Sequence, residues 1–246
     1  MKALVLHGIG DLRFEAAWPD PVVPEGWACV RVGASGICGS DLPRLMQHGA
    51  YKHPLIPGHE FAGTVVEPGL TALPKGRKVA ILPQIPCGQC AGCRVGPFHC
   101  TNYDFIGSRR DGGFAEYCAV PASNLFPLPD GLPLEAGAFI EPLAVTLHVV
   151  RRANLAAGSR VLVLGGGAIG ILTAQWARIL GGREVVLADI RDESLAIAAE
   201  CGIEKVFNPL SDAFKAQAAF THIFEAAGAT AALVTAINKA VPRAVL

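Results

Sequence analysis

The segment from Val161 to Gly170, with the sequence VLVLGGGAIG, constrains the fold of this chain more than any other feature. An apolar run of strand length leads into the spacing Gly-x-Gly-x-x-Gly, and a helix-like run follows from Ala168 to Leu180. In a βαβ unit this spacing places backbone N–H groups and the positive end of a helix against a pyrophosphate. The segment therefore predicts a dinucleotide-binding parallel sheet.

The dinucleotide is expected to be NAD. Asp189 closes the next predicted strand, nineteen residues after the last glycine of the motif. An acidic side chain at that place suits hydrogen bonds to both ribose hydroxyls of NAD and repels the additional phosphate of NADP. Arg191 stands two residues later and keeps NADP open as an alternative. The predicted cofactor-binding residues are Gly165, Gly167, Ala168, Ile169, Gly170, Asp189 and Arg191.

Two domains of different character are predicted. Residues 1–150 are rich in Pro and Gly with short β-type runs, which indicates an irregular, mostly β domain. Residues 151–246 alternate between strand and helix patterns, which indicates an α/β domain with helices on both faces of a parallel sheet. The last residues, 243–246, predict the start of a fifth strand, whereas the usual order has six. We therefore expect a C-terminally incomplete sheet, from a shortened chain or one that another segment completes.

Composition restricts the partners and the compartment. Lys plus Arg and Asp plus Glu number 21 each, so net charge offers no general attraction to nucleic acid or to a membrane surface. An anionic ligand must therefore be held locally. The N-terminal sequence lacks the apolar core of a signal peptide, and a cytoplasmic protein is expected. The uncharged run from Val161 to Ala177 is divided by glycines, which favours a buried βα unit over a membrane span.

Four cysteines lie close together in the first domain, with the spacing Cys87-x2-Cys90-x2-Cys93-x6-Cys100. Four thiolates at such spacing can close a tetrahedral shell around one zinc ion and leave no position for a substrate. In a reducing compartment the pattern favours a metal over disulfides. A structural zinc site is therefore predicted, in a lobe that spans residues 85–102.

A second, mixed set of metal-binding side chains is dispersed: Cys38 in GICGSD, His59 and Glu60 in GHE, and Glu141 before a proline. Thiolate, imidazole and carboxylate together are typical of catalytic zinc, where one position stays open to water or substrate. Each residue alone is unremarkable, because a single Cys is usually a small buried hydrophobic residue. It is their joint occurrence that predicts a catalytic site.

These patterns together resemble the medium-chain, zinc-dependent alcohol and polyol dehydrogenases, in which a GroES-like catalytic domain precedes a Rossmann domain. The resemblance extends over the whole sequence. Its most specific stretches are Gly39–Arg44, Tyr103–Tyr117 and Gly137–Pro142.

The resemblance implies a role for each dispersed residue. Cys38, His59 and Glu141 would bind the catalytic zinc, with Glu60 a further ligand or an alternate one. Ser40 would be the proton-relay hydroxyl, with Asp41 beside the ligands. The cysteine lobe would hold the structural zinc, although this chain has one residue fewer between its last two cysteines than the family usually has. Family members also continue beyond the position of Leu246, with a span that commonly forms a homo-oligomeric contact.

The implied reaction is hydride transfer from a secondary alcohol of a sugar alcohol to NAD. The stretch Tyr103–Tyr117 resembles family members that act on a phosphorylated sugar alcohol, and the resemblance thus implies a phosphorylated substrate, which requires a local anion site. Arg109 and Arg110 are the predicted phosphate contacts, and Arg44 and Lys52 are weaker candidates, although the two adjacent arginines also suit a solvated turn. Two alternatives remain: a threonine, sorbitol or butanediol dehydrogenase of the same family, and an inactive zinc- and nucleotide-binding remnant.

Overall fold

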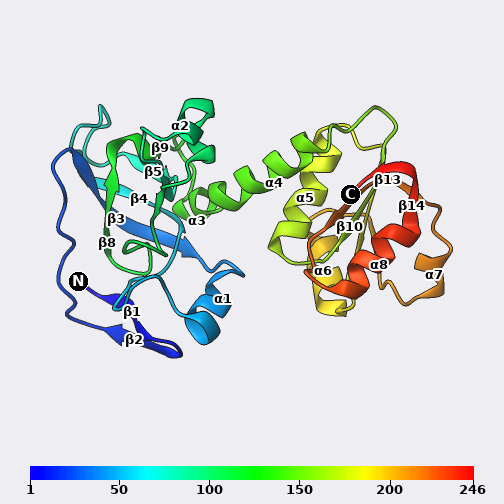
Figure 1. Cartoon of the computed structure of the whole chain (residues 1–246), viewed down its shortest axis with the longest axis horizontal. Coiled ribbons are helices and arrows are strands. Elements are labelled where there is room, and N and C mark those ends of the chain that lie inside the picture. The colour runs from blue at the N-terminus through cyan, green and yellow to red at the C-terminus, as the bar shows by residue number, and fades with distance from the viewer. The chain divides into compact units, whose positions relative to one another are not determined.

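The computed structural model describes residues Met1 to Leu246, which form two compact units, Met1–Glu141 and Pro142–Leu246. The division lies within helix α4 (Ile140–Arg152), and the predicted domain boundary at residue 150 falls in the same helix. The combination of an irregular β unit and a parallel α/β unit confirms the predicted fold class (Figure 1).

The first unit is built on a five-stranded antiparallel sheet with the strand order β8-β3-β4-β5-β9. Two small antiparallel pairs, β1-β2 and β6-β7, and several short helices complete it. The sheet strands are β3 (Trp27–Gly36), β4 (Glu60–Glu67), β5 (Lys78–Ile81), β8 (Tyr117–Pro121) and β9 (Leu125–Pro127). The other elements are β1 (Ala3–Gly8), β2 (Asp11–Glu15), β6 (Gln84–Ile85), β7 (Asp104–Phe105), α1 (Asp41–Pro43), a π-helix (Arg44–His48), α2 (Ala91–Val95), α3 (Leu134–Ala138) and 3₁₀ helices at Pro97–His99 and Ala122–Asn124.

The sheet of this unit is apolar on both faces. On one face Val30 and Phe61 pack in a buried cluster, and on the other Ala62 and Ala80 pack with Ala138 of α3. Neighbouring residues of a strand point to opposite faces, so Phe61 packs in the first cluster and Ala62 packs in the second. The register pairs Gly36 at the end of β3 with Glu60 at the start of β4, which brings the segments beyond these two strand ends together.

The second unit is a parallel sheet with the strand order β12-β11-β10-β13-β14, which is the dinucleotide-binding order as far as its fifth strand. Val161 and Val163 of β10 face one buried cluster, and Leu162 and Leu164 face the other. Strands covered on both faces are expected to be continuously apolar. The elements are β10 (Arg160–Leu164), α5 (Ala168–Ile179), β11 (Glu184–Ala188), α6 (Asp192–Glu200), β12 (Lys205–Phe207), α7 (Asp212–Lys215), β13 (Phe220–Glu225), α8 (Thr230–Lys239) and β14 (Ala240–Val245).

The last strand begins earlier than the sequence pattern predicted. β14 starts at Ala240, three residues before the expected start at Arg243, and pairs in parallel with β13. The reason is Pro242, because a proline cannot continue a helix and drives the residue before it toward an extended conformation. The segment from Val161 to Ala177 forms β10 and the first part of α5, as predicted, and none of the helices has the length and apolar character to cross a membrane.

Candidate metal centres and dinucleotide site

The dispersed metal-binding residues converge at one end of the antiparallel sheet. Cys38 follows β3, and His59 and Glu60 stand at the start of β4, so the Gly36–Glu60 register sets them side by side. The ligand atoms of Cys38, His59 and Glu60 all lie within 4.8 Å of one another. Ser40 also lies here, and its hydroxyl donates a hydrogen bond of 3.3 Å to the Cys38 sulfur.

Asp41 is fully buried and contacts two residues of this cluster, Cys38 and His59. Its Oδ2 accepts a hydrogen bond of 3.0 Å from the backbone N–H of Cys38, and its Oδ1 accepts one of 3.0 Å from Arg44. The same Oδ1 lies 3.4 Å from Nδ1 of His59, which is buried and makes no hydrogen bond. Burial disfavours the charged ring, but contacts with Asp41 and Cys38 outweigh it and raise the pKa of His59 to about 10.

Glu141 lies outside this close group. It stands in the first turn of α4, half-buried, and burial raises the pKa of its carboxyl group. The charges of His59 and of the Glu60 and Asp41 carboxylates also act on that pKa, which places Glu141 in the same neighbourhood. The structure therefore brings together three of the four predicted ligand residues and leaves the fourth nearby.

The donor set fits a zinc ion. A thiolate, an imidazole and a carboxylate are zinc ligands, and three protein ligands leave one coordination position for substrate. The backbone makes room for the carboxylate, because a Cβ atom at Gly36 would lie 2.5 Å from Oε2 of Glu60. A residue other than glycine at position 36 would therefore displace the Glu60 side chain.

The four lobe cysteines form a second closed group, in which all ligand atoms lie within 4.8 Å of one another. The Sγ–Sγ separations are 3.5 Å for Cys90–Cys93, 3.8 Å for Cys90–Cys100 and 3.9 Å for Cys87–Cys93. Sulfurs at the corners of a tetrahedron around zinc, each about 2.3 Å from the metal, are about 3.8 Å apart. Backbone hydrogen bonds from Thr101 and Cys93 lower the pKa of Cys90 to about 5, whereas burial and the neighbouring thiols raise the pKa of Cys93 to about 12.

The short spacing between the last two lobe cysteines does not prevent closure. The chain runs from α2 through Gly96 into the 3₁₀ helix at Pro97–His99 and returns at Cys100. Gly92 allows this tight return, because a Cβ atom there would overlap the carbonyl oxygen of His99. Cys100 is buried, and its sulfur accepts a hydrogen bond of 3.2 Å from the backbone N–H of Cys87.

The three glycines of the Gly-x-Gly-x-x-Gly motif have three different surroundings. Gly165 has a φ of +111°, and a Cβ atom on it would lie 2.7 Å from the carbonyl carbon of Ala226, so the turn requires glycine. A Cβ atom on Gly170 would overlap the carbonyl oxygen of Gly165. Around Gly167, in contrast, there is open space for 4 Å, and Ala168 and Ile169 begin α5 directly after it. These are the tight turn, the close helix–strand packing and the pyrophosphate approach that the motif requires.

Asp189 connects the glycine loop to the end of β11. Its Oδ2 accepts a hydrogen bond of 2.6 Å from the backbone N–H of Gly166, and its Oδ1 accepts one of 2.8 Å from that of Arg191. The Arg191 side chain is exposed, and its Nε lies 3.8 Å from the same carboxylate. Both predicted ribose-end residues therefore stand at the glycine loop, where β10 and β11 end side by side.

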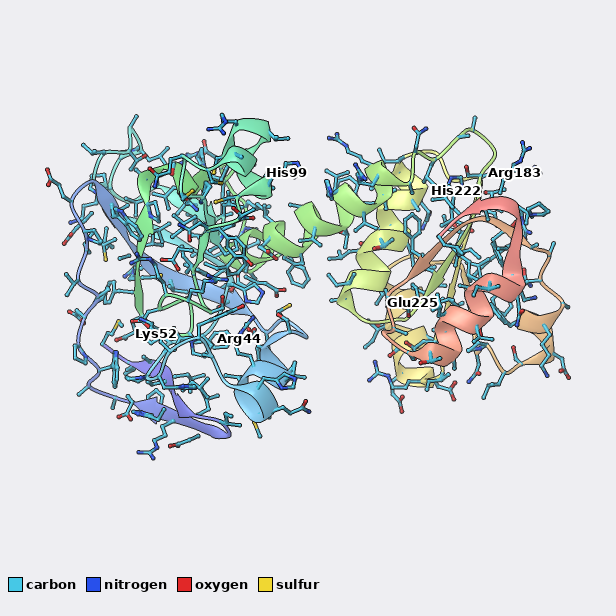
Figure 2. The ribbon with its side chains drawn as sticks, in the orientation of Figure 1. Arg44, Lys52, His99, Arg183, His222 and Glu225 are labelled. Carbon is cyan, nitrogen blue, oxygen red and sulfur yellow. The ribbon has the colours of Figure 1, made fainter.

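The four basic residues proposed for phosphate differ in their partners. Arg110 forms an ion pair with Asp104. Arg44 and Lys52, labelled in Figure 2, pair with Asp41 at 3.0 Å and with Asp111 at 3.8 Å. Arg109 has no carboxylate partner; its guanidinium carbon lies 4.4 Å from the ring centroid of Tyr51 and 4.7 Å from that of Tyr103. Neither tyrosine was predicted as a site residue, although both are visible in the sequence close to the predicted ligands.

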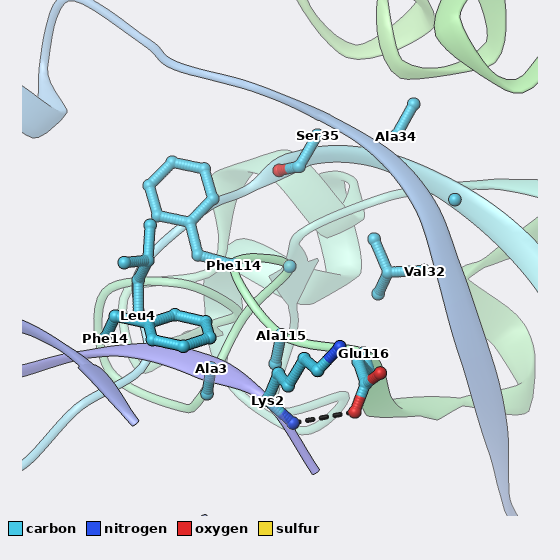
Figure 3. A pocket seen from close by; sticks show the side chains of 12 residues that line it. Lys2, Ala3, Leu4, Phe14, Val32, Ala34, Ser35, Phe114, Ala115 and Glu116 are labelled. Atoms are coloured by element: carbon cyan, nitrogen blue, oxygen red, sulfur yellow. Dashed lines mark hydrogen bonds between the residues drawn. The ribbon is translucent and has the colours of Figure 1, made fainter. Parts of the chain in front are cut away.

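None of the predicted site residues lines the shallow cavity of about 340 Å³ that lies between the N-terminal strands and β3. Figure 3 shows its apolar wall of Leu4, Phe14 and Phe114, and the hydrogen bond of 2.7 Å from the Lys2 backbone N–H to the Glu116 carboxylate. The metal-binding clusters and the glycine loop are thus separate from this cavity.

Comparison with known proteins matches a different family in each of the two units. The family described as alcohol dehydrogenase GroES-like domain matches residues 24–130, and the family described as zinc-binding dehydrogenase matches residues 168–246. Galactitol 1-phosphate 5-dehydrogenase of Escherichia coli K12 is 42% identical over 211 residues, which cover 85% of this chain and 61% of that protein. Sorbitol dehydrogenase of Bombyx mori is 36% identical over 213 residues, which cover 83% of this chain and 61% of that protein. The chain thus spans less than two thirds of the length of these relatives.

Solved structures agree over nearly the whole chain. The crystal structure of galactitol-1-phosphate dehydrogenase from Escherichia coli matches with a TM-score of 0.89 and 38% identity, over 99% of this chain and 73% of that one. A zinc-binding dehydrogenase from Sinorhizobium meliloti bound to NADP matches with a TM-score of 0.91 and 35% identity, over 99% and 74%. An alcohol dehydrogenase from Escherichia coli CFT073 complexed with NADH matches with a TM-score of 0.88 and 30% identity, over 99% and 74%.

Proposed function

Because this chain belongs to the zinc-dependent alcohol and polyol dehydrogenases, with a GroES-like domain and a Rossmann domain, we propose that its protein oxidises a phosphorylated sugar alcohol with NAD. The proposed substrate is galactitol 1-phosphate, after the relative that is 42% identical. Oxidation of its C5 hydroxyl produces a ketone, and numbering the product from its nearer end gives tagatose 6-phosphate. The compartment proposed from the sequence is the cytoplasm, and a homo-oligomer is proposed from the family.

One observation carries the proposal: the ligand atoms of Cys38 and of the adjacent residues His59 and Glu60 come from two separate parts of the chain and lie within 4.8 Å of one another. We propose that these residues hold the catalytic zinc and that Glu141 is an alternate ligand from the nearby turn of α4. The lobe of Cys87, Cys90, Cys93 and Cys100 would hold a second, structural zinc. In this scheme each chain binds two zinc ions with different functions.

The chain's own residues then have defined tasks in catalysis. Zinc, when bound, lowers the pKa of a coordinated alcohol toward neutrality. Ser40 is exposed and its hydroxyl already contacts the Cys38 sulfur, so it can take a proton from the reacting hydroxyl and pass it to solvent. Asp41 holds the Cys38 backbone and faces the His59 ring, which keeps both ligands oriented.

In the second unit the glycine loop would bind the pyrophosphate of NAD, and NAD supplies the hydride acceptor. Asp189 favours NAD because its carboxylate lies at the end of β11, where the adenosine ribose binds in this fold. Arg191 is exposed beside it and keeps NADP as the alternative cofactor.

The proposal is tested with the whole protein that carries this sequence. Zinc per chain is measured, and NADH formation is followed with galactitol 1-phosphate, galactitol, sorbitol, threonine and butanediol. Two zinc ions and turnover of galactitol 1-phosphate are expected. Turnover of an unphosphorylated compound alone would replace the proposed substrate by another of the family. One zinc ion without any turnover would support the inactive remnant instead.

A further inference from the structure

The net charge of the chain is 0, so the protein as a whole does not attract a phosphorylated substrate. Binding of the phosphate group therefore requires a cationic side chain that is not already paired. Four basic residues were predicted as phosphate contacts, and three of them already pair with a carboxylate: Arg44, Lys52 and Arg110. Such a partner competes with phosphate for the cation and adds like-charge repulsion. Arg109 has no such partner, so its positive charge remains available.

The Arg109 side chain is held by two aromatic rings. Its guanidinium carbon lies 4.4 Å from the Tyr51 centroid and 4.7 Å from the Tyr103 centroid, within the range of a cation–π contact on each. The contacts come from segments 52 residues apart, and they hold a side chain that would otherwise have much rotational freedom. A guanidinium stacked on rings keeps the N–H groups along its edge for hydrogen bonds, and two of these match the oxygens of a phosphate.

The turn that carries Arg109 is built directly on the segment that precedes His59. The backbone N–H of Gly113 donates a hydrogen bond of 2.8 Å to the carbonyl of Gly58, and a Cβ atom at Gly107 would lie 3.1 Å from the backbone nitrogen of His59. Successive Cα atoms are 3.8 Å apart, so the Cα of Arg109 lies within about 8 Å of that of Gly107.

Aromatic contacts connect the same two places. The ring of Phe105 packs edge-on against His59 with 5.7 Å between centroids, and the ring of Tyr103 packs against Phe105 at 6.3 Å. The group that braces Arg109 is therefore part of the packed wall beside the predicted catalytic ligand. A hexitol phosphate is an extended molecule, with its phosphate several bonds from the hydroxyl that is oxidised.

From these observations, and resting on the proposed function, we infer that Arg109, braced by Tyr51 and Tyr103, binds the phosphate of the substrate and makes the enzyme prefer phosphorylated polyols. Arg110, which the sequence placed equally with Arg109, instead ties the turn to Asp104. The two adjacent arginines thus have different tasks.

The inference is tested by the variant Arg109→Gln in the whole protein. A hydrogen bond to a charged group contributes about 1.5–3 kcal/mol, so kcat/KM for galactitol 1-phosphate should fall about 10- to 100-fold. The kcat/KM for unphosphorylated galactitol should stay within about twofold, since that substrate has no group for Arg109. Arg109→Lys keeps the charge but loses the paired hydrogen bonds, and should give an intermediate value. The variant Tyr51→Leu removes the nearer ring of the brace and leaves the Tyr103–Phe105–His59 contacts in place, so it should lower the value for the phosphorylated substrate more than the value for galactitol.

Arg13→Gln is the matched control, because it removes an exposed arginine of the same unit that pairs with Asp11. It should change neither value. Binding of galactitol 1-phosphate is also measured by titration calorimetry, with inorganic phosphate as competitor, which needs no turnover. Affinity for both should fall in Arg109→Gln and not in Arg13→Gln.

The outcomes separate this inference from the proposed function. If no polyol is oxidised, the proposed function fails, and the calorimetry still decides the role of Arg109. If both polyols are oxidised equally well by the unaltered protein, the dehydrogenase function stands and the inference is overturned. It is also overturned if Arg109→Gln leaves the preference and the binding unchanged, or if Arg110→Gln rather than Arg109→Gln removes them.

Discussion

The buried carboxylate of Asp41 lies 3.4 Å from Nδ1 of His59. The same carboxylate accepts hydrogen bonds from the backbone of Cys38 and from Arg44. One side chain therefore orients two of the proposed zinc ligands, from the segment after β3 and the segment before β4, and is itself held in place by Arg44. Side chains that orient metal-binding histidines in this way commonly increase the affinity of the site for its metal.

Replacing Asp41 by Asn should therefore weaken catalytic zinc binding about 10- to 100-fold, which is typical when such a partner is lost. The measurement is the release of zinc to a chromogenic chelator, with the four-cysteine site as an internal reference. Asp130→Asn is the matched control, because the Asp130 side chain is 95% exposed and pairs only with Arg77. Equal zinc retention in the two variants would show that Asp41 does not position His59.

Two glycine substitutions should separate cofactor binding from folding. In Gly167→Ala the new methyl group enters open space, so stability should change by less than about 0.5 kcal/mol while NADH affinity falls at least about tenfold. In Gly170→Ala it meets the Gly165 carbonyl, and stability should fall by about 1–3 kcal/mol. Urea unfolding measures the stability of each variant, and fluorescence titration measures its affinity for NADH. If Gly167→Ala were less stable than Gly170→Ala, the open space at Gly167 and the close contact at Gly170 would be contradicted.

The charge of Asp189 should decide between the two nicotinamide cofactors. Asp189→Ser removes the negative charge, so the affinity for NADPH relative to NADH should rise about tenfold or more. Both dissociation constants can be measured by fluorescence titration. The companion variant Arg191→Gln keeps the carboxylate, and should leave NADH affinity within about twofold while weakening NADPH binding. An unchanged ratio in Asp189→Ser would place the cofactor's ribose elsewhere.

Loss of one lobe cysteine should cost one metal ion and much stability. Cys100→Ser removes a buried sulfur from the four-cysteine group, so zinc content should fall by about one ion per chain and the free energy of unfolding by more than about 2 kcal/mol. Cys201→Ser, at an exposed position outside the lobe, is the control. Metal analysis and thermal unfolding provide the two readouts. A normal zinc content in Cys100→Ser would mean that the lobe does not hold zinc through this residue.

The carboxylate of Glu184 should stabilise the second unit in a pH-dependent way. Hydrogen bonds from Arg160 and Lys205, both at 2.7 Å, lower its pKa from 4.5 to about 2. A lowered pKa means that the unfolded chain takes up the proton first, so the stabilisation is complete above pH 4.5 and is lost as the pH falls toward 2.

Glu184→Gln should therefore lower the free energy of unfolding by about 1 kcal/mol at pH 7, a value suited to ion pairs near the surface. The difference from the unaltered protein should shrink when urea unfolding is repeated at pH 4. Glu204→Gln, whose side chain is 84% exposed, serves as the control. A difference that grows at lower pH would have the opposite sign to the one derived.

Much of the second unit could be predicted because its signals are local. The strand, the turn at Gly165 and the helix follow one another within a few residues, and Gly170 meets the nearby Gly165 carbonyl, although Gly165 itself packs against the distant Ala226. A parallel sheet covered on both faces followed from the alternation of strands and helices. The start of β14 lies three residues before the predicted one, because Pro242 drives Val241 toward an extended conformation.

The dispersed site could be predicted only in part. Residue types and family resemblance singled out Cys38, His59, Glu60 and Glu141, but not which carboxylate stands closest. The pairing of β3 with β4 places Glu60 in the close group, and Glu141 lies outside that group. Likewise, the sequence could not distinguish Arg109 from Arg110, since their partners Tyr51 and Asp104 meet them only after folding.

The sequence by itself determined the dinucleotide-binding unit and the cysteine lobe, because the strand–glycine–helix motif and the four cysteines each lie within a short stretch of the chain. Tertiary structure alone decided which carboxylate joins Cys38 and His59, and which arginine keeps an available charge. The physical reason is that these choices depend on strand register and on side-chain packing between distant segments. A shift of register or of one turn would exchange the partners without changing the sequence motifs.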